Sequence, residues 1–292
     1  MTTFFFKIIF RLLSSLPLCI LHRMGALLGR LTYAFSSQYA ARMRENLQQA
    51  GFSLDDEQGR RLLAQSIAEA GKGLMELPWI WGRPYDEVLG SVLECRGMQH
   101  FEAAQASGKS IIFLTPHLGC FEIAALYMAQ YLPITVLYRP PRLSWLEGLM
   151  RAGRERGQAR LAKADISGVR LLYKALKRGE AIGLLPDQVP SQGEGEWAEF
   201  FGRPAYTMTL VGRLAQASGA TVLLAAAERQ AQGRGYVIRL EPLDLDFSLP
   251  VPQQINTALE QMIRKCPAQY LWSYNRYKVS RGVLPPDAVK ES

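Results

Sequence analysis

The sequence predicts an α/β fold, in which a mixed sheet is flanked by helices and preceded by an N-terminal membrane-associated helix. From residue 92 onward, short runs rich in aliphatic and β-branched residues alternate with helical segments, which is typical of strands covered by helices. Two of these runs are joined by a short glycine-containing stretch, which indicates a hairpin and therefore a mixed sheet. Residues 4–35 are mostly apolar, and every charged residue among them is basic.

The N-terminal apolar stretch has the pattern of an amphipathic helix that lies in a membrane interface. At about 100° per residue, Lys7 and Arg11 fall on one side of a helix, while Leu12 and Leu16 lie largely elsewhere. Basic charges next to apolar side chains suit the headgroups of anionic lipids. We expect Pro17 to kink or divide this helix. The alternative is an ordinary N-terminal helix that is buried in the protein.

The same stretch is neither a typical signal peptide nor a clear membrane span. Its charges lie inside the apolar region, and no clear cleavage site follows. Its longest run without charge or histidine before residue 30 covers residues 12–21, whereas a spanning helix needs about 20 apolar residues. The sequence leaves open whether the segment spans a membrane or lies flat on it. We expect a membrane-anchoring segment over residues 1–45 and a single α/β domain over residues 46–292.

The elements of the α/β domain follow in order. Ser53 and the acidic residues after it favour a capped helix over residues 55–81, and Pro84 closes this region. Strands are then expected at residues 92–96, 110–115, 134–138, 181–185, 221–225 and 236–240. Most alternate with helices, which are expected at residues 98–106, 121–131, 145–156, 169–178 and 207–217. The last two strands form the hairpin, and a helix over residues 253–265 leads to a final strand at residues 270–274.

The composition narrows the range of partners. The chain has 292 residues, a net charge of +8 and a pI of about 9.4, which favours nucleic acid, acidic lipid or a phosphorylated substrate. No zinc finger, RNA-recognition box or arginine–glycine tract supports a nucleic-acid-binding module, and the apolar N-terminus argues against one. The four cysteines fit no zinc site and are expected to be reduced thiols in an intracellular protein. We expect no metal and no cofactor.

Polar residues follow three of the predicted strands. Residues 116–122 follow the strand at 110–115, residues 139–142 follow the strand at 134–138, and residues 186–188 follow the strand at 181–185. In open α/β sheets, ligands bind beyond the carboxyl ends of the strands. We therefore expect these three clusters to converge on one edge of the sheet, where the site lies.

His117 and Glu122 are the strongest candidates for chemistry in these clusters. His117 precedes a helix and Glu122 lies in its first turns, so the two side chains can meet although they are five residues apart. An imidazole can take a proton from an attacking hydroxyl near neutral pH, and a carboxylate can orient it and offset its charge. The structural alternative for Glu122 is compensation of the helix dipole. A helix start near Gly119 is a candidate source of backbone N–H donors to an oxyanion.

Cys120 offers a rival mechanism. It lies three residues from His117, so an acylated cysteine in a two-step transfer or a thioesterase is an alternative. Cys120 lies in an apolar run without an evident activating arrangement, which favours a small buried side chain instead. Substantial activity in Cys120→Ser would support direct activation of the substrate by His117.

The segment from His117 to Glu122 resembles the H-x-x-x-x-D/E box of glycerolipid acyltransferases. Further segments occur in order along the chain: Leu-Tyr-Arg-Pro at 137–140, Arg-Glu-Arg at 154–156, Leu-Leu-Pro-Asp-Gln at 184–188, Phe-Phe-Gly-Arg-Pro-Ala at 200–205, and Tyr-Leu-Trp-Ser-Tyr-Asn-Arg-Tyr at 270–277. Together they resemble the late acyltransferases of lipid A biosynthesis, the lauroyl and myristoyl transferase family. The likeness covers nearly the whole chain. Many members have asparagine before the histidine of the box, where this chain has Pro116.

The resemblance implies a glycerolipid-acyltransferase-like fold and an O-acyltransferase at the cytoplasmic face of the inner membrane of a Gram-negative bacterium. It implies secondary acylation: acyl carrier protein donates a fatty acyl chain to a hydroxyl of a phosphorylated lipid A precursor, through a His117–Glu122 dyad. The expected partners are acyl carrier protein, the lipid A precursor and membrane lipid, and no nucleic acid. Transfer to another glycolipid acceptor and a Cys/His thioesterase-type hydrolase are the alternatives.

Several further residues are candidates for substrate binding. Arg139 and Arg154 match positions in the resembling segments, and arginine binds phosphate or carboxylate through a two-pronged contact. Arg156 is a third candidate for the same task. Asp187 is expected to pair with one of these arginines or to orient the substrate, and Arg276 lies in the terminal aromatic segment.

Overall fold

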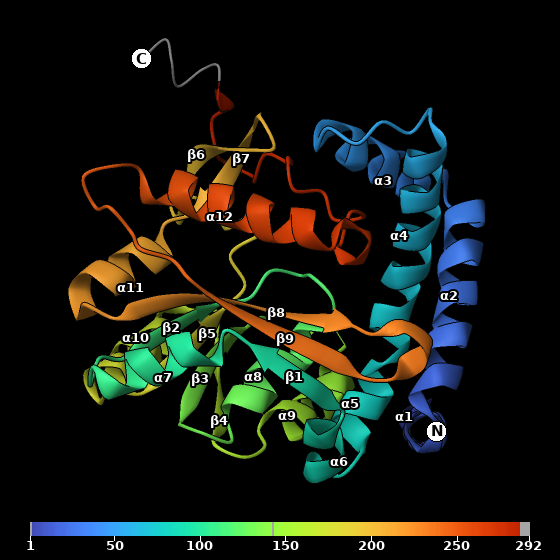
Figure 1. The fold of residues 1–292 in the computed structure, drawn as a ribbon, viewed down its shortest axis with the longest axis horizontal. Coiled ribbons are helices and arrows are strands. Elements are labelled where there is room, and N and C mark those ends of the chain that lie inside the picture. Colours follow the sequence, from blue (N-terminus) through green and yellow to red (C-terminus); the bar gives the residue numbers. More distant parts are fainter. Residues whose placement is uncertain (1, 142, 287–292) are drawn as a thin grey trace.

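A seven-stranded mixed sheet lies at the centre of the protein (Figure 1). A computed structural model describes residues 2–141 and 143–286. The strands run in the order β1-β9-β8-β2-β5-β3-β4, and all neighbours are parallel except the antiparallel pair β8–β9. Their bounds are β1 Val92–Arg96, β2 Ile111–Leu114, β3 Ile134–Tyr138, β4 Ala159–Lys163, β5 Ala181–Leu184, β8 Thr221–Arg229 and β9 Tyr236–Pro242. The predicted mixed sheet and its hairpin are confirmed.

Helices cover both faces of this sheet, because alternate residues of the central strands point to opposite sides. On one face, Ile112, Ile182 and Leu224 pack with α10, α11 and α12. On the other face, Phe113 and Leu223 pack with α7 and α8. Their bounds are α7 Met98–Ala106, α8 Phe121–Met128, α10 Ile166–Lys177, α11 Leu210–Ser218 and α12 Val251–Lys265. Strands β2 and β5 are buried throughout, as expected for central parallel strands.

The N-terminal helices flank one end of the sheet. They are α1 Thr2–Ser15, α2 Leu18–Phe35, α3 Ser37–Gln49 and α4 Glu57–Met75. Pro17 separates α1 from α2, as predicted. Figure 1 shows α2 and α4 side by side. The two helices approach closely at Gly25 and Gly71, where a Cβ on Gly71 would lie 1.9 Å from the Gly25 carbonyl oxygen. Only glycine permits this backbone contact.

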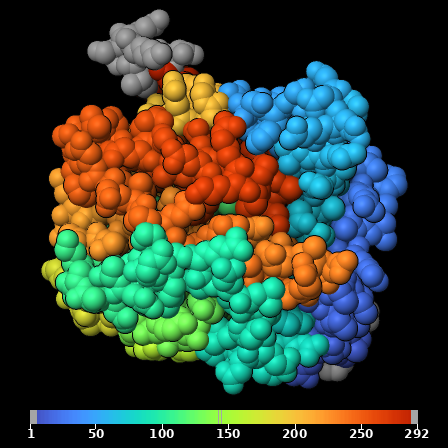
Figure 2. All heavy atoms as spheres, viewed as in Figure 1, coloured from blue at the N-terminus to red at the C-terminus, as the bar shows by residue number. Residues whose placement is uncertain are grey.

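Contact of the N-terminal segment with a membrane stays a prediction. Within the described residues, every helix is too short or too polar to pass through a lipid bilayer. Helices α1 and α2 nevertheless expose large apolar side chains, including Leu12, Leu27 and Phe35. Figure 2 shows that these N-terminal segments form one side of the molecular surface. The proposed division at residue 45 falls inside α3 and stays a prediction.

Several predicted element boundaries were wrong. The expected helix at 55–81 is two helices, α4 and α5 Leu77–Gly82, because Pro78 lies at the start of a second helix. The helix expected at 207–217 begins later, because its first residues belong to β7. Strand β7 Arg203–Met208 pairs with β6 Gly195–Phe200 in a separate antiparallel hairpin. The remaining helices are α6 Tyr85–Gly90 and α9 Ser144–Arg154, with short 3-10 turns η1 Ala231–Gly233 and η2 Pro267–Gln269.

The final strand expected at residues 270–274 does not form. Tyr270 makes only an isolated bridge to Leu118, and turns follow it. The segment pairs with a loop instead of a strand: the Leu271 amide donates to the His117 carbonyl at 3.0 Å. The aromatic segment therefore braces the loop that carries His117.

Candidate active site

His117 and Asp187 face each other at the carboxyl edge of the sheet. Strands β2 and β5 are parallel neighbours with Leu114 opposite Leu184, and each residue of the pair lies three positions beyond this point. The His117 ring Nδ1 lies 2.8 Å from one Asp187 oxygen, and the His117 backbone N–H donates to the other oxygen at 2.8 Å. The parallel register thus brings together two residues that are 70 positions apart.

These contacts define the hydrogen-bonding state of the imidazole. A carboxylate only accepts hydrogen bonds, so Nδ1 carries the proton toward Asp187. The Gln188 side-chain nitrogen lies 3.1 Å from His117 Nε2, which leaves Nε2 as the acceptor. Asp187 is 2% exposed. Burial opposes its ionisation, but the His117 ring and amide outweigh burial and hold the pKa of Asp187 below its ordinary value.

Glu122 contacts a different set of partners from the one that the sequence predicted. Its carboxylate accepts hydrogen bonds from Arg154 Nε at 2.7 Å, from Arg154 Nη2, and from Trp81 Nε1 at 3.0 Å. The hydrogen bonds of the His117 ring go to Asp187 and Gln188. The expected hydrogen bond between His117 and Glu122 is therefore replaced by the one to Asp187. The reason is that Glu122 points toward α5 and α9, while Asp187 comes from the neighbouring strand.

The loop between β2 and α8 is fixed by its backbone hydrogen bonds. Gly119 has a φ of +61°, and a Cβ there would lie 2.0 Å from the Ala227 carbonyl oxygen. The Gly119 amide donates to the Gln269 carbonyl at 3.0 Å, and the Cys120 amide donates to the Ala227 carbonyl at 2.8 Å. Both amides already donate to backbone carbonyls. The expectation that the helix start near Gly119 supplies donors to an oxyanion is therefore wrong for the amides of Gly119 and Cys120.

A cavity of about 650 Å³ opens beside His117. Its polar lining includes His117, Glu122 and Gln188. Its apolar lining comes from the sheet and from α8 and α9, and includes Phe113, Ala125, Met128, Ile134, Val136, Met150 and Leu161. The volume lies in the range of small-molecule pockets, and the lining suits a hydrocarbon chain whose reactive end lies at His117.

The predicted arginines divide into two groups. Arg139 and Arg154 line the cavity. Arg156 does not; it donates to the carbonyls of three residues in and around α5 and α9 and lies over the Tyr85 ring. Arg276 is buried at β7, where it donates to the Tyr206 carbonyl at 2.8 Å. Arg156 and Arg276 therefore bind backbone carbonyl groups and do not line the cavity.

Two arginines that the sequence analysis did not select also line the cavity. Arg170 lies on α10 and Arg213 lies on α11, and both are exposed. Arg139 and Arg170 make no ion pair with any residue that the structure describes. The sequence offered no signal for Arg170 and Arg213, because their position depends on how α10 and α11 pack.

Cys120 has the properties of a buried side chain. It is 1% exposed and is not part of the cavity lining. Burial, followed by the nearby Glu76 carboxylate, raises the pKa of the Cys120 thiol well above its ordinary value. A nucleophilic cysteine needs a stabilised thiolate and access to substrate. The geometry thus favours chemistry at His117 over an acylated Cys120.

A model of the bacterial lipid A biosynthesis acyltransferases matches residues 1–279. The chain belongs to this family. It is therefore an acyltransferase, as the sequence predicts. The match covers the N-terminal helices as well as the domain that carries His117.

Three relatives from Escherichia coli K12 resemble more than half of this acyltransferase. A lipid A biosynthesis lauroyltransferase is 27% identical over 94% of this chain and 90% of its own length. A lipid A biosynthesis palmitoleoyltransferase is 25% identical over 90% of this chain and 87% of its own length. A lipid A biosynthesis myristoyltransferase from the same organism is 22% identical over 68% of this chain. These relatives are named for different acyl chains, so family membership alone does not define the chain that this protein transfers.

Proposed function

We propose that this protein transfers a fatty acyl chain from acyl carrier protein to a hydroxyl of a phosphorylated lipid A precursor, with His117 as the general base. The observation that carries the proposal is the hydrogen bond between His117 and Asp187, with His117 in the lining of a largely apolar cavity. A base held in one tautomer next to a hydrocarbon-sized cavity suits the activation of a hydroxyl toward an acyl thioester.

The proposed reaction starts at His117 Nε2. The acceptor hydroxyl displaces the Gln188 amide and gives its proton to Nε2 as its oxygen attacks the thioester carbonyl. The tetrahedral intermediate then collapses, the carbon–sulfur bond breaks, and the imidazolium returns the proton to the leaving thiolate. Asp187 holds Nδ1–H and stabilises the imidazolium charge, as the acid does in a Ser-His-Asp arrangement.

Glu122 has a positioning task in this proposal. It is the second member of the dyad that the sequence predicts, and it lines the cavity with His117. Its ion pair with Arg154 joins α8 to α9, and both helices contribute residues to the cavity lining. Glu122 thereby supports the geometry around His117 through Arg154, while Asp187 acts on the ring directly.

Arg139, Arg170 and Arg213 are the proposed ligands of the acceptor's phosphate groups. All three are exposed and line the cavity that contains His117. A guanidinium group binds a phosphate through two parallel hydrogen bonds. Arg154 is less suitable, because Glu122 already occupies its guanidinium.

The N-terminal helices are the proposed membrane contact. Along α2, a strip of exposed apolar residues recurs every three or four positions and consists of Ile20, Met24, Leu27, Leu31 and Phe35. Arg23 and Arg30 are exposed next to this strip. Such a helix is suited to lie at the surface of an anionic membrane, and we propose the cytoplasmic face of a Gram-negative inner membrane. Pelleting with anionic vesicles should weaken in a Leu27→Glu/Leu31→Glu variant and persist in Leu93→Glu on β1.

The test of the proposed function is an acyl-transfer assay with the full-length protein. Donors are acyl carrier proteins loaded with several chain lengths and the matching coenzyme A thioesters. Acceptors are a phosphorylated lipid A precursor and the same precursor after phosphatase treatment. We expect transfer from the carrier protein that falls when the phosphates are removed. Equal transfer to the dephosphorylated acceptor would overturn the phosphate role, and no transfer from any donor would overturn the proposed reaction.

A further inference from the structure

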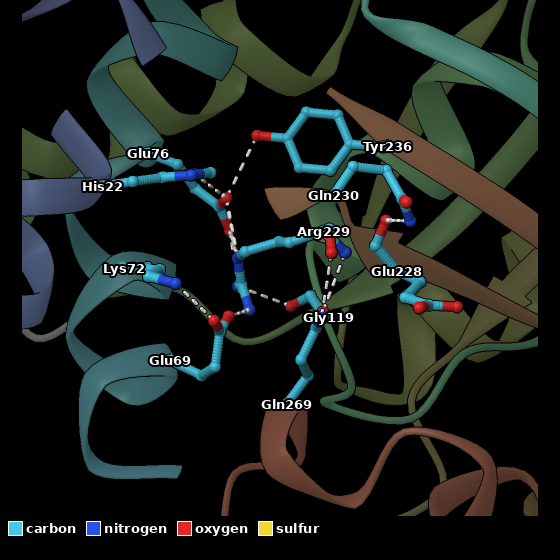
Figure 3. Close-up of polar contacts among 10 residues, drawn as sticks. All are labelled: His22, Glu69, Lys72, Glu76, Gly119, Glu228, Arg229, Gln230, Tyr236 and Gln269. Carbon is cyan, nitrogen blue, oxygen red and sulfur yellow. Dashed lines mark hydrogen bonds and ion pairs between the residues drawn. The ribbon is translucent and has the colours of Figure 1, made fainter. Parts of the chain in front are cut away.

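A second polar cluster lies in the interior, next to Gly119 of the loop that carries His117 (Figure 3). At its centre, Arg229 of β8 pairs with Glu76 at the end of α4. The Glu76 carboxylate also accepts a hydrogen bond from the Tyr236 hydroxyl at 3.0 Å and lies 3.3 Å from His22 Nε2 on α2. All four side chains are buried. The cluster thus connects the sheet to two of the N-terminal helices.

Arg229 also contacts the loop that carries His117. Its Nη2 donates to the Gly119 carbonyl oxygen at 2.7 Å. The Gln269 side-chain oxygen accepts a hydrogen bond from the Arg229 amide at 2.8 Å, and the Gln269 side-chain nitrogen donates to the Arg229 carbonyl at 3.0 Å. The Gln269 carbonyl in turn accepts the Gly119 amide. Both polar groups of the Gly119 backbone are therefore held by a unit formed from Arg229 and Gln269.

The geometry points to Arg229 as a positioning residue for the proposed acyl transfer: it fixes the Gly119 backbone, and through it the placement of His117. Glu76, held by His22, orients the guanidinium, so the α2–α4 helix pair contributes to the alignment of the catalytic loop. This inference rests on the role proposed for His117. Arg229 itself is absent from the cavity lining and acts only through the loop.

A role in stability alone explains this arrangement less well. Buried ion pairs often add little net stability, because removing the charges from water offsets their attraction. A pair of well-packed apolar side chains would join α4 to β8 at similar or lower cost. An apolar side chain has no N–H groups to donate. Arg229, in contrast, binds Glu76 through Nε while its Nη2 donates to the Gly119 carbonyl. Arginine has a rigid set of five donors that can do both.

Arg229→Lys tests the inference because lysine keeps the charge next to Glu76 but has a single nitrogen in place of the Nε and Nη2 groups that together bind Glu76 and Gly119. Arg239→Lys is the matched control, since Arg239 lies on the adjacent strand and, among the residues that the structure describes, its one ion pair is with Glu228. We expect Arg229→Lys to lower kcat roughly 10- to 100-fold with KM nearly unchanged, because small displacements of a catalytic group have large effects on rate. Arg239→Lys should retain the wild-type kcat.

Hydrogen exchange supplies a readout that does not depend on activity. The amides of Gly119 and Cys120 are hydrogen-bonded and should be protected in the wild type. In Arg229→Lys they should exchange faster, while the amides of β2 and β5 stay protected. If Arg229→Lys does not fold, Gln269→Ala replaces it, because Gln269 is only half-buried and holds the same unit.

Three results would overturn the inference. The first is a wild-type kcat together with wild-type loop protection in the Arg229→Lys or Gln269→Ala protein. The second is an equal loss of kcat in Arg239→Lys. The third is faster exchange across the whole domain of the Arg229→Lys or Gln269→Ala protein, instead of in the loop alone. If the wild type transfers no acyl group, the proposed function fails. The exchange of Gly119 and Cys120 then still decides whether Arg229 positions the loop.

Discussion

Asp187 accepts two hydrogen bonds from His117, one from the ring Nδ1 and one from the backbone N–H. The same carboxylate thus sets both the tautomer of the imidazole and the course of the chain that carries it. The sequence analysis paired Glu122 with His117 and expected Asp187 to pair with an arginine or to orient the substrate. In the structure, Asp187 makes the direct contact with His117, and Glu122 binds Arg154.

Replacing Asp187 with asparagine should remove the charge that stabilises the imidazolium and favour the wrong tautomer. In a comparable triad, this change lowers kcat by about 10⁴. We expect kcat for acyl transfer to fall by roughly 10² to 10⁴, with a small change in KM. Asp246→Asn, in an exposed loop, is the control. A kcat within twofold of the wild type would exclude Asp187 as the partner of the base.

Glu122→Gln should reduce stability as well as activity, because it leaves the guanidinium of Arg154 without its charged partner. The Glu122 side chain is 4% exposed and that of Arg154 is 23% exposed. Breaking a buried ion pair costs about 3–5 kcal/mol, and the partial exposure of Arg154 places this pair at the low end. A double-mutant cycle with Arg154→Met, followed by urea unfolding, should give a coupling energy of about 0.5–3 kcal/mol. Strict additivity would show that the two residues do not stabilise each other.

Glu76 should make the folded state sensitive to acid. Burial alone would raise its pKa, but Arg229 and His22 outweigh burial and lower the pKa of Glu76 from 4.5 to about 2. Because the folded pKa is the lower one, this stabilisation is complete above about pH 4.5 and is lost as the pH falls toward 2. At about 1.4 kcal/mol per pKa unit, the loss amounts to roughly 3–4 kcal/mol.

Urea unfolding at a series of pH values measures this effect. Glu76→Gln should be less stable at neutral pH, since the Arg229 charge is left uncompensated. Its stability should also depend less on pH between about 4.5 and 2 than that of the wild type. Parallel curves for the two proteins would show that Glu76 titrates normally.

Gly183 should influence the length of the acyl chain. It lies in the middle of β5 and lines the cavity, where an added Cβ would lie 3.2 Å from a methyl group of Val136. Gly183→Val should fill part of the cavity and shift the preference to shorter donors. We expect kcat/KM for the longest accepted donor to fall about tenfold or more, since one methylene group in an apolar pocket is worth 10-fold or more.

Ile182→Val is the control for this prediction, because Ile182 lies on the same strand and packs on the opposite face of the sheet. It should lower stability by about 1 kcal/mol and leave the chain-length preference unchanged. A competition assay with mixed donors measures the preference. An unchanged preference in Gly183→Val would place the acyl chain elsewhere.

The sequence predicted the edge of the sheet on which the site lies, but not which side chains meet there. Strand–helix alternation and the hairpin gave the mixed sheet, and strand-end residues gave the clusters at His117, Arg139 and Asp187. The order of the strands was not predicted, and only the adjacency of β2 and β5 brings Asp187 to His117. One signal was present: Thr115-Pro116-His117 and Leu185-Pro186-Asp187 follow two apolar strands at the same spacing.

Other features depend on contacts that the sequence pattern does not encode. Strand β4 was missed because residues 159–163 include two basic residues and follow a predicted helix without a clear boundary. The segment at residues 270–274 has the composition of a strand, yet its backbone groups pair with the His117 loop. The Glu76–Arg229 pair joins residues 153 positions apart, and neither residue lies in a recognisable motif.

The comparison of His117→Ala with the wild type tests the central claim most directly. The measurement is acyl transfer from loaded acyl carrier protein to a phosphorylated lipid A precursor, with circular dichroism to establish that the variant is folded. We predict that kcat falls by at least about 10³, because the variant retains binding but has no base. A folded His117→Ala protein that retains transfer close to the wild-type rate would contradict the assignment of His117 as the base.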